Sequence, residues 1–202
     1  MNIVFFGASH TAGTGLGDRT ARFATIVAST LTSVETNLGV DGSQAIGRDD
    51  NGMLISDNSG IARVPDVIDA DADKVLVLYG EDDWKSAGDP GNPELFRQGT
   101  FLWDYDTIVR GLLDAQEQEQ VVLITIPALD YTKTNSRDLS IAAYNNQIRH
   151  TASKYDLTLV DPENEAASLF EAADFDSDGN LTHPGHNKVA QLLAAHPALL
   201  RI

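Results

Sequence analysis

The sequence places a serine where chemistry is possible, directly after a short apolar run. Residues 4–17 read V-F-F-G-A-S-H-T-A-G-T-G-L-G, so Ser9 stands where an expected strand gives way to a loop of small residues. A serine hydroxyl becomes a nucleophile when a base accepts its proton and fixed donors face the oxyanion that forms. The block predicts a nucleophile at Ser9, although a turn or a helix cap uses the same residue type.

Three more blocks of polar and small residues share this placement. They read N-L-G-V-D-G at 37–42, G-E-D-D-W at 80–84 and D-G-N-L-T-H-P-G-H at 178–186. The first two follow expected strands, and the third precedes the last expected helix. Because ligands of open parallel sheets bind at the carboxyl ends of the strands, we expect the four loops to converge on one edge.

The elements that must position these loops alternate along the chain. Four short apolar runs predict buried strands, at residues 2–6, 74–79, 121–126 and 157–160. Residues 34–38 are a weaker fifth candidate. Helical spacing of apolar residues predicts helices over residues 19–31, 105–118, 141–155 and 187–195. This alternation predicts a three-layer α/β/α domain with a parallel sheet of about five strands. Residues 41–60 and 84–100 are expected to form long loops.

The amino-acid composition excludes several classes of protein function. A chain of 202 residues fits one domain, 1–202, with a single core. Its 14 Lys and Arg against 30 Asp and Glu give a net charge of −16, which disfavours nucleic acid and anionic membranes as partners. The absence of cysteine excludes thiolate chemistry. No apolar run is long enough to span a membrane. Only eight residues precede Ser9, too few for a signal peptide, so we expect a protein that is cytoplasmic or has been trimmed.

Together these blocks resemble the SGNH or GDSL hydrolase family of serine esterases and lipases. G-A-S-H at 7–10 corresponds to the family's G-D-S block, and N-L-G-V-D-G to its N-x-G-x-x-G loop. G-E-D-D at 80–83 approximates G-x-N-D, and 178–186 approximates the D-x-x-H before the terminal helix. The resemblance implies a flavodoxin-like fold and hydrolysis of small acyl or acetyl esters through an acyl-enzyme, without cofactor or metal. It leaves the natural ester and the oligomeric state open.

The resemblance also implies roles for individual residues. Ser9 is the nucleophile, and the N–H groups of Ser9 and Gly39 form the oxyanion hole with the side chain at position 82. His183, which is followed by proline, is the base; the acid position three residues earlier holds Asn180, with Asp178 as a substitute. In a second alignment, which starts the helix at residues 185–186, the base position falls on Asn180 and His183 is incidental.

Position 82 departs from the family pattern in a way that affects catalysis. The family's asparagine donates an N–H to the oxyanion, whereas an ionised aspartate only accepts hydrogen bonds and repels negative charge. Asp82 must therefore be protonated, turned away from the site, or a sign of lost activity. The alternative to a working esterase is a binding or structural module that kept the fold.

Two other motifs suggest different functions. Residues 174–182, D-F-D-S-D-G-N-L-T, begin like a calcium loop, but the twelfth position is Gly185 in place of the glutamate that such loops require. G-T-G-L-G at 13–17 lies too far past the strand for a dinucleotide fingerprint and is followed by an aspartate. We therefore expect a solvated acidic loop and no nucleotide. His186 is expected on the surface of the last helix.

Overall fold

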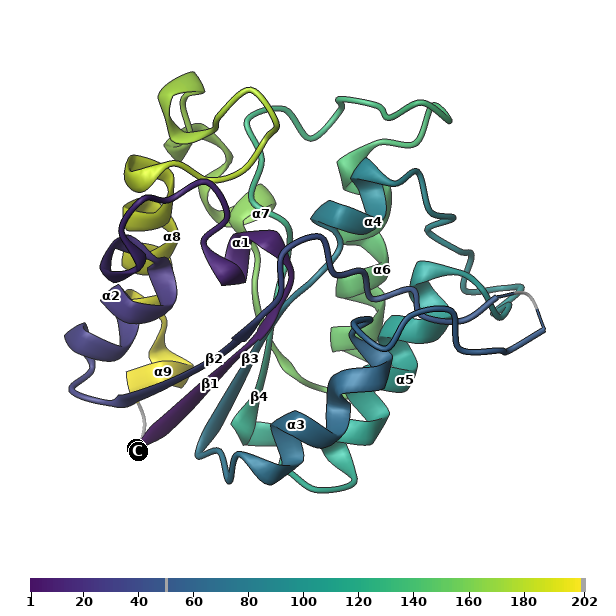
Figure 1. Ribbon diagram of the computed structural model, residues 1–202, viewed down its shortest axis with the longest axis horizontal. Helices are drawn as coiled ribbons and strands as arrows, with labels where there is room; N and C mark the ends of the chain where they lie inside the picture. The colour runs from purple at the N-terminus through teal and green to yellow at the C-terminus, as the bar shows by residue number, and fades with distance from the viewer. Residues whose placement is uncertain (50, 201–202) are drawn as a thin grey trace.

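The computed structural model describes residues 1–49 and 51–200, and in this part of the chain it contains one five-stranded sheet (Figure 1). Every neighbouring pair of strands is parallel, and the strand order is β2-β1-β3-β4-β5. The strands are β1 (Asn2–Gly7), β2 (Val34–Gly39), β3 (Lys74–Leu78), β4 (Val121–Ile124) and β5 (Thr158–Val160). The predicted parallel sheet is confirmed.

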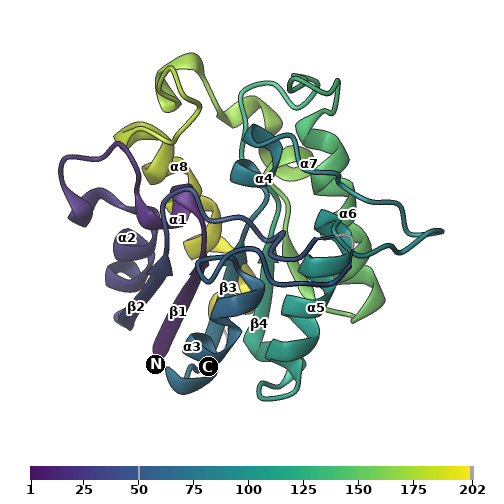
Figure 2. The same ribbon diagram turned by 45° about the vertical axis from the view of Figure 1, so that its right-hand side comes forward.

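Helices cover both faces of the sheet, as Figures 1 and 2 show. One face carries α2 (Phe23–Thr30), α8 (His183–Ala195) and α9 (Pro197–Leu200), and the other carries α3 (Val64–Asp69), α5 (Phe101–Leu113) and α6 (Ile141–Lys154). Successive side chains of β1 enter opposite layers: Ile3 and Phe5 pack in the α2–α8 layer, while Val4 and Phe6 pack in the α3–α5–α6 layer. The continuous apolar run of β1 follows from this two-sided burial.

Shorter elements connect the layers. They are α1 (Ser9–Ala12), α4 (Glu81–Lys85) and α7 (Pro162–Ala166), with 3₁₀ turns η1 (Arg19–Ala21), η2 (Ile61–Arg63), η3 (Gln118–Gln120), η4 (Ala167–Leu169) and η5 (Ala172–Asp174). Both α1 and α4 lie at the carboxyl edge of the sheet, near the upper ends of the strands in Figure 1. These two single-turn helices therefore carry residues of the first and third blocks to one edge.

The helix boundaries differ from the predicted ones for local reasons. The fifth helix begins at residue 101 because the Thr100 side chain accepts a hydrogen bond from the Trp103 N–H and caps it. The eighth begins at His183, with a proline in its first turn, where the missing N–H of proline has no consequence. The sequence did not predict α3 or α4, which are too short to show a helical period.

None of the helices within residues 1–49 and 51–200 has the length and apolar character that a membrane span requires.

Candidate active site

Ser9 is the first residue of α1, two residues past the end of β1, and its side chain is buried. Within the described residues its Oγ takes part in two hydrogen bonds. It donates to Asp41 Oδ1 at 3.0 Å and accepts from the Gly42 N–H at 2.9 Å. Thr14 Oγ1 donates to the same Asp41 oxygen at 2.7 Å. The loop after β2 therefore supplies both partners of the candidate nucleophile.

Asp82 lies in α4 with its carboxylate turned toward Ser9. Its Oδ2 accepts the Ser9 N–H at 3.0 Å, and its side chain is buried. Its Oδ1 lies 3.9 Å from Lys85 Nζ, one turn along the same helix. The structure thus excludes an Asp82 that faces away from the site. The carboxylate instead occupies the Ser9 N–H, the group that the sequence predicts as an oxyanion donor.

Gly39, the last residue of β2, allows α1 to pack closely against that strand. A Cβ at this position would lie 2.3 Å from the Ala12 backbone nitrogen, which is shorter than any normal contact. The Gly39 N–H donates to Asn37 Oδ1 at 2.9 Å. Its predicted role as an oxyanion donor remains a prediction, and it requires this hydrogen bond to open.

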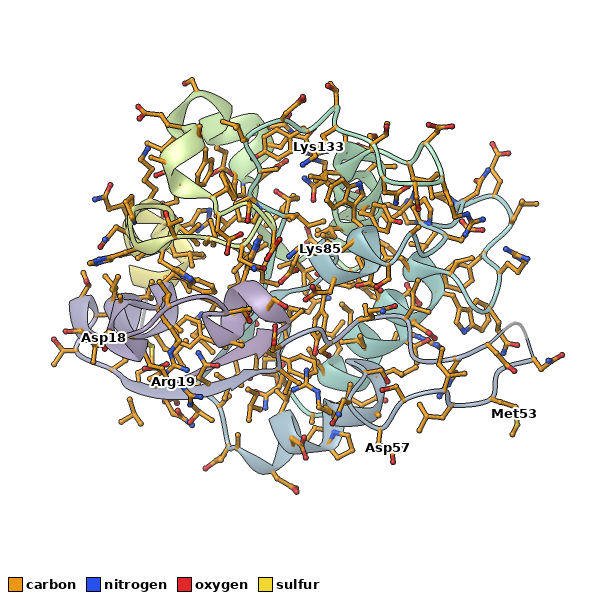
Figure 3. All side chains as sticks on the ribbon, turned by 45° about the horizontal axis from the view of Figure 1, so that its top comes forward. Asp18, Arg19, Met53, Asp57, Lys85 and Lys133 are labelled. Atoms are coloured by element: carbon orange, nitrogen blue, oxygen red, sulfur yellow. The ribbon has the colours of Figure 1, made fainter. Side chains whose placement is uncertain are left out.

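Lys85 joins α4 to the loop that precedes α8. Its Nζ donates to Asn180 Oδ1 at 2.7 Å, and Asn180 Nδ2 donates to Asp176 Oδ2 at 3.2 Å. Figure 3, which brings the carboxyl edge of the sheet forward, shows Lys85 near the middle of this face. The sequence did not predict Lys85 as a site residue, because it follows the G-E-D-D-W block and matches no motif.

His183 and Asp178 are both exposed. The His183 carbonyl accepts a hydrogen bond from Asn187, and the Asp178 N–H donates to Asp176 Oδ1. The hydrogen bonds of Ser9 Oγ described above go to the 41–42 loop instead. The roles of His183 as base and Asp178 as acid therefore remain predictions, while Asn180 is linked to the site through Lys85.

The buried histidines His10 and His186 are both neutral at physiological pH. Burial lowers the pKa of His10 to about 4, and its Nε2 lies 3.2 Å from the Gly179 carbonyl oxygen. Burial likewise lowers the pKa of His186 to about 3. His186 Nδ1 accepts the Phe23 N–H, and its ring stacks on the Phe23 ring. The expectation that His186 lies on the surface was wrong, because this ring joins α8 to the start of α2.

Residues next to Ser9 line two cavities. One, of about 190 Å³, is mainly apolar. Its lining includes Trp84, Ile126 and Phe175, and also His10 and charged side chains such as Glu81 and Lys85. The other, of about 250 Å³, is more polar and is lined by residues that include Asp41, Gly42, Ser43, Gln44 and Asn58. His10, which follows Ser9 in the chain, lines the first cavity, and both partners of Ser9 Oγ line the second. The immediate surroundings of Ser9 therefore include one mainly apolar cavity and one polar cavity.

Glu81 is buried beneath the apolar cavity and gives stability a pH dependence. Its Oε1 accepts the His10 N–H at 2.9 Å, while burial, followed by the charge of Asp82, raises its pKa to about 8. The unfolded chain releases this proton near about pH 4.3, whereas the folded protein retains it to about pH 8. The contribution of Glu81 to the free energy of unfolding therefore falls as the pH rises through this range.

The substitution Glu81→Gln removes this titration and keeps an acceptor for the His10 N–H. We expect the Tm of E81Q, relative to that of the wild type, to rise between about pH 5 and about pH 8.5. Thermal melts followed by circular dichroism at both pH values measure the difference. A Tm difference that is the same at both values would contradict the assignment.

The acidic loop over residues 174–182 is held by the chain's own donors. Asp174 Oδ2 accepts from Lys188 Nζ and from the Glu171 N–H, both at 2.6 Å. Asp176 Oδ1 accepts the N–H groups of Asp178 and Asn180. Over the described ranges, no group of three or more His, Cys, Asp or Glu side chains is placed to hold a metal ion.

Comparison with known proteins agrees with this fold. The profile of the GDSL-like lipase/acylhydrolase family matches residues 5–191. No curated protein sequence matches the chain.

Solved structures share the fold at low sequence identity. A protein from Lactobacillus plantarum has a TM-score of 0.78 at 21% identity, over 95% of this chain and 93% of its own. A lipase/acylhydrolase from Enterococcus faecalis has a TM-score of 0.71 at 17% identity, over 96% and 93%. A member of the lipolytic protein G-D-S-L family from Veillonella parvula DSM 2008 has a TM-score of 0.68 at 19% identity, over 100% of both chains. With the family profile matching nearly its whole length, the chain belongs to the GDSL-like lipase/acylhydrolase family, a family of hydrolases.

Proposed function

We propose that the protein hydrolyses small acyl or acetyl esters through an acyl-enzyme at Ser9. The observation that carries the proposal is the placement of Ser9. It stands at the carboxyl end of an inner strand, its hydroxyl donates to a carboxylate, and its neighbours line two cavities. In the reaction, Ser9 Oγ attacks the ester carbon, the alcohol leaves, and water then releases the acid from the acyl-serine.

The dimensions and lining of the cavities support a short acyl group. The apolar cavity of about 190 Å³ is smaller than the sites of roughly 300–1,000 Å³ that hold drug-sized ligands. We assign the acyl chain to this cavity and the alcohol to the polar one. An acetyl to butyryl chain suits such a volume better than a long fatty acid does.

Asp82 is expected to restrain this activity. A carboxylate placed where negative charge develops raises the energy of the transition state relative to the ground state. The ammonium of Lys85, 3.9 Å from Asp82 Oδ1, offsets part of this effect. We therefore propose a hydrolase whose kcat/KM is lower than it would be with a hydrogen-bond donor at position 82.

We expect Asp82→Asn to raise kcat/KM for a short acyl ester by about tenfold or more. The amide oxygen of asparagine still accepts the Ser9 N–H, and its amino group supplies the donor that the carboxylate lacks. Initial rates with a p-nitrophenyl acetate series measure the effect, and Asp89→Asn, on the loop after α4, is the matched control. A fall in kcat/KM at unchanged Tm would show that the Asp82 carboxylate has a catalytic role of its own.

The function is tested by turnover and by covalent labelling of the same serine. We expect hydrolysis of p-nitrophenyl acetate or butyrate by the wild type. A serine-reactive fluorophosphonate should add one label, which peptide mass spectrometry locates on Ser9. If the folded protein shows no turnover and no labelling, the proposal is overturned, and the chain is a binding or structural module instead.

A further inference from the structure

We propose that the Asp41 carboxylate is the general base that accepts the Ser9 proton, in place of a histidine. The inference rests on the proposed function and names a further catalytic residue for it. The geometry points to Asp41 because its Oδ1 lies 3.0 Å from Ser9 Oγ and accepts the hydroxyl proton in a hydrogen bond. A general base must lie within about 2.6–3.2 Å of the group that it deprotonates.

The surroundings of the hydroxyl leave it ready to attack. A serine hydroxyl has one proton and two lone pairs. In this structure the proton points to Asp41, and one lone pair accepts the Gly42 N–H at 2.9 Å. The second lone pair remains for the ester carbon. The Gly42 N–H also stabilises the negative charge that grows on Oγ as the proton leaves.

Asp41 is placed to remain ionised and to exchange protons with solvent. Hydrogen bonds from Thr14 and Ser9 lower the pKa of its carboxyl, and the charge of Lys85 lowers it further. The side chain is exposed, so water reaches it. The other ionisable groups of the elements around this pair are Glu81, Asp82, Asp83 and Lys85 on α4 and the buried, neutral His10 on α1. Burial raises the pKa of Glu81 to about 8 and that of Asp83 to about 7.

The protons balance over the two half-reactions. Ser9 Oγ forms a bond to the acyl carbon as its proton passes to Asp41, and the carbonyl oxygen becomes an oxyanion. When the ester C–O bond breaks, the Asp41 carboxyl gives this proton to the leaving alcohol. Water then attacks the acyl-serine and gives a proton to Asp41. That proton returns to Ser9 Oγ when the acid leaves.

The pH profile of the wild type tests this assignment without any substitution. An imidazole base loses activity below its pKa, normally about 6.5. A carboxylate base with a lowered pKa keeps its activity well below that pH. We therefore expect kcat/KM for p-nitrophenyl acetate to stay level between about pH 7 and about pH 5. An acid limb near about pH 6.5 would overturn the inference and favour a histidine base.

Substitution of the base gives the second test. We expect Asp41→Asn to lower kcat by about 100-fold or more with little change in KM, because proton transfer of this kind contributes roughly 10²–10⁴ to the rate. Asp114→Asn, at the exposed end of α5 that leads toward the start of β4, is the matched control. Activity of Asp41→Asn within about threefold of the wild type would overturn the inference.

The two proposals fail in different ways. If Ser9 is labelled and the wild type turns over ester, but Asp41→Asn is as active as the wild type, only the base assignment falls. If the wild type shows neither turnover nor labelling, the hydrolase proposal itself falls. Labelling of Ser9 in Asp41→Asn at a much lower rate than in the wild type would support both.

Discussion

Replacing Ser9 by alanine is expected to lower kcat/KM for a short acyl ester at least about 1,000-fold. Without the hydroxyl no acyl-enzyme forms, and the remaining groups only bind the ester and orient water. The substitution should otherwise affect the structure little. The backbone N–H of residue 9 still donates to Asp82 Oδ2, and alanine favours the helical conformation of α1. We therefore expect the Tm to change by only a few degrees, which separates lost chemistry from lost folding.

A second serine provides the control for this experiment. Ser153 is exposed near the end of α6, the helix that begins at residue 141. Ser153→Ala should leave both kcat/KM and fluorophosphonate labelling at the wild-type level. If Ser9→Ala also kept its activity, hydrolysis would not pass through an acyl-serine at this position. The protein would then be a hydrolase with a different nucleophile.

The sheet could be predicted from the sequence because burial on both faces leaves a clear pattern. Strands β1, β3 and β4 are buried almost throughout, so their sequences are apolar at consecutive positions. β2 is only partly buried and contains polar residues, which explains its weaker signal. Once strands and helices alternate, the parallel sheet and the site at its carboxyl edge follow from topology.

The partners of Ser9 could not be predicted in the same way. Asp41 lies inside the N-L-G-V-D-G block, but nothing in the block distinguishes a solvated carboxylate from one that meets a hydroxyl 32 positions away. Its role depends on the path of the loop after β2, which tertiary contacts determine. The same holds for Lys85 and Asn180, which are 95 positions apart and meet at 2.7 Å.

Position 82 shows what a sequence pattern establishes and what it leaves open. The pattern identified the residue and the conflict between a carboxylate and an oxyanion. It could not show that Asp82 accepts the Ser9 N–H or that Lys85 lies 3.9 Å away. The side-chain direction removes the alternative in which Asp82 faces away from the site, and it therefore supports the predicted gain in activity for Asp82→Asn.

Arg63 is a buried cation that holds the carboxyl ends of β1 and β2 together, and Arg63→Met is expected to lower the free energy of unfolding by at least about 3 kcal/mol. The guanidinium donates to the carbonyl oxygens of Leu38, Gly7 and Asn58 at 2.8, 3.1 and 3.2 Å, and also to the Tyr79 hydroxyl. Methionine fills much of the volume but leaves these acceptors unpaired. Each buried unpaired group costs about 1–3 kcal/mol.

The loss should appear as a fall in Tm of about 6–12 °C, since about 1 kcal/mol shifts the Tm of a domain of this size by about 2–4 °C. Arg63→Lys should recover only part of the lost stability, because an ammonium lacks the planar set of N–H donors with which a guanidinium reaches several carbonyl oxygens. Arg110→Met, which removes a half-exposed ion pair with Asp106 on α5, is the control and should cost no more than about 1 kcal/mol. If Arg63→Met and Arg110→Met lowered the free energy of unfolding equally, the carbonyl oxygens at the ends of β1 and β2 would have found other donors. Stability would then rest on the apolar layers alone, and the loop carrying Asp41 would be held to the sheet without Arg63.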